Sequence, residues 1–187
     1  MSFNRNRGRR IAIVFLLAVL GGLASWFADR QDYPANVSGP AEVIDGDSLV
    51  IAGERIRLVG IDAPEGRQMC ERVGPLGHAG RPADWPCGRE SADRLRRLIG
   101  PRSVLCDVED VDKYDRLLAV CRVGGRDINR WMVENGWAVS YGRHRRLERA
   151  AERARRGIWA GRFERPRNWR DRHRGRRAGL LDAGVPD

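Results

Sequence analysis

The alternation of apolar and polar positions predicts strands in the first half of the chain. Between residues 41 and 58, the short apolar segments EVI, SLVI and RIRLVGI are separated by Asp45-Gly46 and by Gly53. Turn residues of this kind between β-branched segments are typical of a hairpin or a meander. We therefore predict three consecutive strands here.

The rest of the chain combines a loop, a hairpin and three helices. Residues 70–88 are rich in Gly and Pro and predict a loop. Two further strands are expected at residues 104–108 and 117–123, with a charged connection between them. Apolar residues recur at helical spacing in three segments, residues 89–99, 127–135 and 143–156. The Arg-rich residues 164–177 are expected to be poorly structured.

The N-terminus has the pattern of an export signal. Four arginines in the first ten residues precede an apolar run of about eighteen residues, at 11–28. This order of a basic and an apolar region predicts either a cleaved signal peptide, with a candidate site at Gly22-Leu23-Ala24, or a membrane anchor. The flanking arginines would keep the N-terminus inside, so the rest should lie outside the cytoplasmic membrane, anchored, periplasmic or secreted. A buried hydrophobic helix is the alternative.

The net charge of +10 and the isoelectric point near 10.7 favour polyanionic partners. Nucleic acid is the first such partner and anionic lipid the second. The alternative is a general bias toward arginine in the composition, because Lys113 is the only lysine. Residues 29–40 are polar and turn-rich and predict a linker between the N-terminal segment and the folded part.

Four cysteines follow the apolar run, in the part expected to reach an oxidising compartment. Cys106 and Cys121 lie at nearly equal distances from the centre of the predicted hairpin, so they can face each other across two antiparallel strands. Cys70 and Cys87 bracket the Gly- and Pro-rich loop. We predict these two disulfides; a zinc site lacks a C-x-x-C pair and a suitably spaced His, and four reduced cysteines are the other alternative.

The densest chemical signal is a series of charged motifs in fixed order. It consists of Asp45-Gly46-Asp47-Ser48, Arg57, Asp62-Ala63-Pro64-Glu65 and Asp112-Lys113-Tyr114-Asp115-Arg116. With these motifs the chain resembles the staphylococcal (micrococcal) nuclease family, also called thermonuclease, from about residue 41 to residue 169. The resemblance implies an α+β fold, mainly a five-stranded OB-like barrel with three helices. Residues 41–169 would then form the domain, and residues 170–187 a flexible tail.

The same resemblance implies a calcium-dependent nuclease with a role for each motif residue. Asp47, Asp62 and the main-chain carbonyl of Ala63 correspond to the calcium ligands, and oxygen donors suit this hard cation. Glu65 corresponds to the general base that activates water. Arg57 and Arg116 correspond to the two arginines that bind the phosphate and stabilise its developing charge. Lys113 and Tyr114 correspond to the residues that contact a terminal phosphate of the nucleotide.

Two positions depart from the family pattern. Where the family commonly has Thr and Gly, this chain has Ala63 and Asp115. The first change should be mild, because the family uses a main-chain carbonyl there. Asp115 adds negative charge beside Arg116 and removes a glycine from a turn, which puts catalytic efficiency in question.

The expected substrates are DNA and RNA, with single strands preferred, and the expected state is a monomer. One alternative is a non-catalytic OB-type nucleic-acid-binding module, since one fold can serve several functions. Another is a membrane-tethered scaffold in which residues 143–177 bind acidic lipid or a partner. The retained acidic cluster has no role in that scaffold.

Overall fold

The computed structural model describes residues 33–72 and 83–182, with side chains as far as residue 174. The predicted signal or anchor at residues 11–28 lies outside the described residues. No helix within the described ranges is long and apolar enough to cross a membrane.

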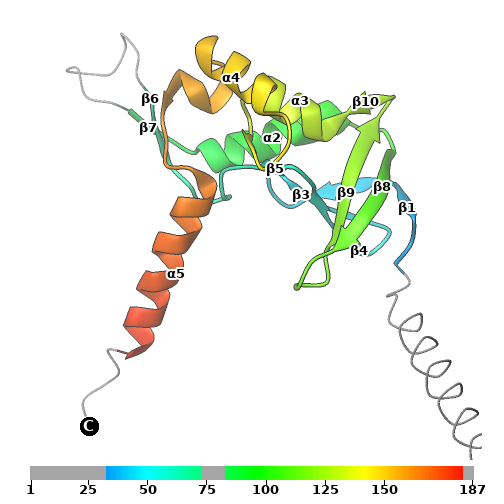
Figure 1. The fold of residues 1–187 in the computed structure, drawn as a ribbon, viewed down its shortest axis with the longest axis horizontal. Helices are drawn as coiled ribbons and strands as arrows, with labels where there is room; N and C mark the ends of the chain where they lie inside the picture. The colour runs from blue at the N-terminus through cyan, green and yellow to red at the C-terminus, as the bar shows by residue number, and fades with distance from the viewer. Residues whose placement is uncertain (1–32, 73–82, 183–187) are drawn as a thin grey trace, which may run out of the picture. The chain divides into compact units, whose positions relative to one another are not determined.

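A curled, seven-stranded sheet forms the main body of the fold (Figure 1). Its strand order is β1-β8-β9-β4-β3-β2, with β10 added beside β9, and all pairs are antiparallel except β4 with β9. The strands are β1 (Asn36–Gly39), β2 (Ala41–Val43), β3 (Ser48–Ile51), β4 (Glu54–Leu58), β8 (Val104–Val111), β9 (Leu117–Val123) and β10 (Arg126–Asp127).

Two small sheets extend this body. One pairs β5 (Ile61–Asp62) with β11 (Val139–Ser140) and thereby fixes the backbone of Asp62. The other has the order β12-β6-β7 and consists of β12 (Gly161–Arg162), β6 (Cys70–Arg72) and β7 (Ala83–Trp85).

Four α-helices are described, together with the short 3-10 helix η2 (Gly157–Ala160). Figure 1 shows α2, α3 and α4 gathered at one end of the sheet. Asp127 caps α3 by accepting a hydrogen bond from the Arg130 amide at 2.8 Å, which explains why this helix begins where the sequence predicts. The helices are α2 (Cys87–Ile99), α3 (Ile128–Glu134), α4 (Arg145–Arg153) and α5 (Pro166–Asp182).

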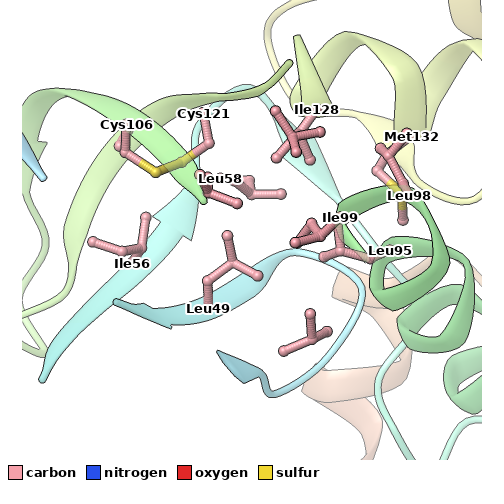
Figure 2. Close-up of a cluster of buried hydrophobic side chains, with 14 of the residues drawn as sticks. Leu49, Ile56, Leu58, Leu95, Leu98, Ile99, Cys106, Cys121, Ile128 and Met132 are labelled. Carbon is pink, nitrogen blue, oxygen red and sulfur yellow. A yellow bond between two sulfur atoms is a disulfide. The ribbon is translucent and has the colours of Figure 1, made fainter. Parts of the chain in front are cut away.

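The core lies between the sheet and the first two of these helices. Residues of β9 alternate between buried and half-buried along the strand, as expected for a sheet with one face packed. Figure 2 shows side chains of β3, β4, α2 and α3 meeting in this core, among them Leu49, Leu58, Leu95 and Met132. Each fully buried aliphatic side chain contributes roughly 1.5–3 kcal/mol relative to an exposed one.

Both predicted disulfides are confirmed. Cys106 and Cys121 are direct partners in the β8–β9 register, with Cα atoms 4.0 Å apart, and their bond is drawn in Figure 2. Cys70 and Cys87 are bonded with Cα atoms 5.6 Å apart, which joins β6 to the start of α2.

The predicted α+β, OB-like architecture is confirmed, but its element count is corrected. The main sheet has seven strands instead of five, and four α-helices are described instead of three. The two added strands are β1 and β10. Strand β1 lies inside the predicted linker at residues 29–40 and is held by pairing with β8, which is distant in sequence, whereas β10 pairs with the neighbouring β9. The added helix is α5, where residues 164–177 were expected to be poorly structured. Pro166 suits the first position of this helix, since its fixed φ is already helical.

Candidate functional site

The turn between β2 and β3 carries the first acidic motif. The Asp47 amide donates to Asp45 Oδ1 at 3.0 Å, which fixes the turn locally. Gly46 lies where a Cβ would come within 2.1 Å of Ser91 Oγ and 2.6 Å of Ala63 Cβ. Only glycine therefore allows this turn to pack against α2 and the Asp62-Ala63 segment.

Asp47 is a buried carboxylate, with 2% exposure. Its Oδ2 accepts a hydrogen bond from the Ala63 amide at 2.7 Å, and its Oδ1 accepts from Ser48 Oγ at 3.1 Å and from Arg57. Burial raises the pKa of Asp47, and the Arg57 guanidinium opposes that rise. Asp47 therefore joins the two acidic motifs directly.

Arg57 joins the same two motifs from β4. Its guanidinium contacts Asp47 Oδ1 and donates to Asp62 Oδ1 at 2.9 Å. Although burial lowers it, the pKa of Arg57 is raised by these two carboxylates, so its charge is secure. Arg57 is held opposite Ser48 by the β3–β4 register. The sheet register thus determines where the two buried carboxylates and one cation meet.

Glu65 follows on a tightly held loop. Gln68 is fully buried; its amide donates to the Glu65 carbonyl at 2.7 Å, and its Oε1 accepts from the Glu65 amide at 3.3 Å. At Gly88, in the first turn of α2, a Cβ would lie 1.7 Å from the Glu65 carbonyl oxygen. The backbone of Glu65 is therefore fixed, while its side chain remains 29% exposed.

Arg170 of α5 completes the acidic cluster. Its Nη1 lies 2.8 Å from Asp62 Oδ1 and 2.7 Å from Glu65 Oε1, and its Nη2 lies 3.0 Å from Asp62 Oδ2. Partial burial lowers the pKa of Arg170, but the hydrogen bonds to Asp62 and Glu65 outweigh this effect and raise it. A helix from the C-terminal part of the chain thus reaches both a predicted calcium ligand and the predicted base.

The tip of the β8–β9 hairpin presents the last motif. Asp112 accepts from Arg116 Nε at 2.8 Å and from the Tyr114 amide at 2.8 Å. Slight burial raises the pKa of Asp112, but these hydrogen bonds outweigh it and hold the pKa below its usual range. Asp115 has a φ of +57°, in the left-handed region that favours glycine, the residue that the resemblance predicts at this position.

A cavity of about 510 Å³ brings much of the predicted site together. Asp47 and Asp62, each 2% exposed, do not line it but contact Arg57, which does. Lys113 and Ala63 do not line it. The lining residues are Asp45, Arg55, Arg57, Glu65, Tyr114, Arg116, Arg170 and Arg174. A larger hollow of about 700 Å³ beside α3 contains none of the predicted site residues.

The two buried carboxylates that contact Arg57 have donor atoms that suit a hard cation. Asp47 and Asp62 each direct an oxygen to the same Arg57 guanidinium, so the two carboxylates converge on one positive group. Calcium prefers such oxygen donors, six to eight of them. In the part of the chain that the structure describes, no three or more His, Cys, Asp or Glu side chains lie close enough together to hold a metal ion by themselves. A cation here would therefore also need main-chain carbonyls and water.

Two groups of site residues were not predicted from the sequence. Arg170 and Arg174 lay in a segment expected to be disordered, although their spacing of four residues places them on one helix face. Gln68 carried no signal, because its role depends on burial and on contacts with residues distant in sequence. Its Nε2 donates to the Glu164 carbonyl at 2.6 Å, ninety-six positions away.

Comparison with known proteins identifies the family of this chain. The sequence model of a family described as "Staphylococcal nuclease homologue" matches residues 55–161. The "Succinoglycan biosynthesis protein ExoI" of Rhizobium meliloti (strain 1021) is 38% identical over 130 residues, covering 66% of this chain and 64% of that protein. A "Probable endonuclease LCL3" of Clavispora lusitaniae is 35% identical over 121 residues, covering 56% of this chain and 47% of that protein.

An "Uncharacterized endonuclease" of Escherichia coli O157:H7 is 31% identical over 129 residues, covering 63% of this chain and 73% of that protein. The matched regions span less than two thirds of the first two relatives. The family match itself includes Arg57, Asp62, Glu65 and Arg116 and covers more than half of the chain. The chain belongs to the staphylococcal nuclease homologue family.

Proposed function

We propose that this protein is a calcium-dependent nuclease that hydrolyses phosphodiester bonds of DNA and RNA without strict sequence preference, single strands being preferred. The observation that carries the proposal is the 510 Å³ cavity, which Glu65 lines together with Arg57 and Arg116, and in which Arg57 contacts the buried carboxylates of Asp47 and Asp62. Phosphodiester hydrolysis needs a base, a means of neutralising phosphoryl oxygens and an activated nucleophile. The first two are present among these side chains.

Glu65 is the general base of this proposal. Its backbone is fixed by Gln68 and by the close approach of Gly88, while its carboxylate faces the cavity. A carboxylate so placed can accept a proton from a water molecule beside a bound phosphate. Its present partner is Arg170, whose Nη1 lies 2.7 Å from Glu65 Oε1 and holds the carboxylate in position.

Arg57 and Arg116 are the phosphate-binding groups. Guanidinium groups bind phosphate through two parallel hydrogen bonds, which adds orientation to charge. Each contact of this kind can be worth about 3–4 kcal/mol when it is aimed at charge that develops in the transition state. Tyr114 at the hairpin tip and its neighbour Lys113, whose Nζ lies 5.1 Å from the Tyr114 ring centroid, are assigned to a terminal phosphate of the substrate.

Asp47, Asp62 and the main-chain carbonyl of Ala63 are assigned as calcium ligands. When bound, calcium would polarise the scissile phosphate and lower the pKa of a ligated water. The Ala63 amide already donates to Asp47, so the two proposed ligand residues are held together without it. The names of the LCL3 and Escherichia coli relatives, which refer to endonucleases, support the same reaction class.

We also place the catalytic part outside the cytoplasmic membrane, as a monomer, either tethered through residues 11–28 or released after cleavage there. The two disulfides support this location, because such bonds persist in oxidising compartments. A C-terminal fusion to a reporter that works only in the cytoplasm should stay silent. An active fusion would contradict the location without affecting the proposed chemistry.

The activity test uses the purified chain with labelled single-stranded DNA and RNA, in calcium and in excess chelator. Cleavage should occur only with calcium. Glu65→Gln should retain binding but lose about 10²–10⁴-fold in turnover, because the shape is kept and the base is removed. Glu71→Gln, which changes an exposed acid on β6 outside the cavity, should behave as the wild type.

Three outcomes would contradict parts of this proposal. Full activity in chelator would refute calcium dependence. Binding without any cleavage would favour the non-catalytic nucleic-acid-binding module. Equal losses of binding and turnover in Glu65→Gln would refute its role as a base.

A further inference from the structure

Helix α5 lies outside residues 55–161, which the sequence model of the family matches, yet it lines the candidate site. The family match ends at residue 161, and α5 begins at Pro166. Arg170 and Arg174 of this helix line the same cavity as Arg57 and Arg116. One wall of the cavity is therefore formed by an element that the family comparison does not explain.

The charge of the cavity favours a polyanion along this wall. Five arginines and two carboxylates line it, so positive charge is in excess. Arg170 also neutralises Asp62 and Glu65, which would otherwise repel a phosphate. Because Arg170 engages both oxygens of Asp62, its guanidinium already has the two-pronged geometry that suits a phosphate.

Arg174 extends this positive surface by one helical turn. Its side chain is 65% exposed and pairs with Asp171 of the same helix, an exchangeable surface contact. Residues four apart on a helix are separated by about 6 Å along its axis and share a face. Two guanidinium groups at this spacing can follow consecutive phosphates of an extended strand.

We propose that Arg170 and Arg174 make α5 a phosphate-binding wall that lengthens the substrate cleft for single-stranded nucleic acid. Arg170 exchanges its carboxylate partners for a phosphate next to the reacting one, and Arg174 binds the phosphate beyond it. This inference rests on the proposed nuclease function, since it assigns further substrate contacts to the same site. Its consequence is a preference for oligonucleotides over very short substrates.

The test measures binding of a labelled twelve-residue single-stranded DNA and of a dinucleotide, by fluorescence anisotropy in chelator, between 50 and 200 mM salt. Arg170→Ala and Arg174→Ala should each weaken binding of the longer DNA and reduce the slope of log K against log salt by about 0.7, as expected for one lost phosphate contact. Arg174→Ala should leave dinucleotide binding unchanged, and Arg174→Lys should restore the slope.

The matched control is Arg172→Ala. Arg172 lies on the same helix, is 53% exposed and pairs with Glu164, but it does not line the cavity. It should retain the wild-type slope. Far-ultraviolet circular dichroism of each variant would show whether α5 is still formed.

The outcomes separate this inference from the function on which it rests. If Arg170→Ala and Arg174→Ala match Arg172→Ala while the wild type binds and cleaves, the wall is refuted and the nuclease proposal stands. If Arg174→Ala weakens dinucleotide and twelve-residue DNA equally, an extended cleft is also refuted. If the wild type neither binds nor cleaves nucleic acid, the nuclease proposal fails and this inference fails with it.

Discussion

Asn129, on the buried face of α3, binds three backbone groups of two other segments, and its replacement should be among the most damaging in the fold. The side chain is fully buried. Its Oδ1 accepts from the Cys121 amide at 3.0 Å, and its Nδ2 donates to the carbonyls of Val59 and Ala119 at 2.9 and 3.0 Å. These bonds connect α3 to β9 and to the residue that follows β4, the strand of Arg57.

The magnitude follows from which groups Asn129→Ala leaves unpaired. The Ala119 carbonyl keeps a second donor, the Val59 amide at 3.0 Å. The short Cα separation of Cys106 and Cys121 is typical of a pair without mutual backbone hydrogen bonds, so the Cys121 amide points away from β8 and loses its partner. The Val59 carbonyl also loses its donor. Each buried backbone group left without a partner costs about 1–3 kcal/mol, so the free energy of unfolding should fall by roughly 3–4 kcal/mol.

Urea unfolding followed by tryptophan fluorescence measures this loss. With a slope of about 1–3 kcal/mol per molar urea, the midpoint should fall by at least about 1 M. Asn135→Ala is the control, because Asn135 follows the same helix but donates one side-chain hydrogen bond, to the Trp131 carbonyl at 3.0 Å, and is only half-buried. Its cost should be about 1 kcal/mol or less. Equal midpoints for the two variants would refute the reasoning.

Three further predictions concern the hairpin between β8 and β9. Asp115→Gly should raise the melting temperature slightly and increase cleavage, because glycine adopts the positive φ without strain and the change removes a negative charge beside Arg116; a lower melting temperature would contradict this. Asp112→Asn should destabilise the protein most above about pH 4 and progressively less below it, because a carboxyl whose folded pKa is lowered stabilises the fold only while it is ionised. Urea unfolding measures this, and an equal loss of unfolding free energy at pH 3 and pH 7 would contradict the prediction. Joint replacement of Cys106 and Cys121 by Ala should cost about 3 kcal/mol for a loop of this length, and calorimetry showing an unchanged melting temperature would contradict it.

Elements with a strong local pattern could be predicted from the sequence. The helix expected at residues 89–99 is α2, and the hairpin expected around residues 104–123 is β8 and β9. Each has a periodic apolar face that packs on the core, and each ends at residues that favour turns. The pairing of Cys106 with Cys121 followed from the same hairpin, because its symmetry places them opposite each other.

Elements that depend on distant partners could not be predicted in this way. The strand β1 lies among turn residues and forms only because β8 offers it a free edge. Helix α5 lacks a continuous apolar face, and its Arg-rich sequence resembles that of a solvated tail. What ties it to the site is the ion pairing of Arg170 with Asp62, over a separation of 108 residues.

The candidate site, too, could be predicted from the sequence only in part. The motifs from Asp47 to Arg116 gave the resemblance to the family, and the structure gathers Arg57, Glu65, Tyr114 and Arg116 around one cavity. The resemblance assigns roles to conspicuous charged residues. It has no means of assigning a role to Gln68, whose effect is exerted through burial.

Gln68 couples the two walls of the cleft. Its backbone amide and its side-chain oxygen hold Glu65, while its side-chain nitrogen binds the carbonyl of Glu164, two residues before α5 begins. Arg170 of α5 in turn contacts Glu65 and Asp62. Glu65, Gln68 and α5 are therefore connected in a closed ring of contacts. Because the buried side chain of Gln68 fixes both the proposed base and the residues just before α5, the position of Arg170 is linked to that of Glu65. In the proposed mechanism, a substrate phosphate that draws Arg170 away would remove the ion pair from Glu65, the proposed base, while Gln68 keeps the backbone of Glu65 in place.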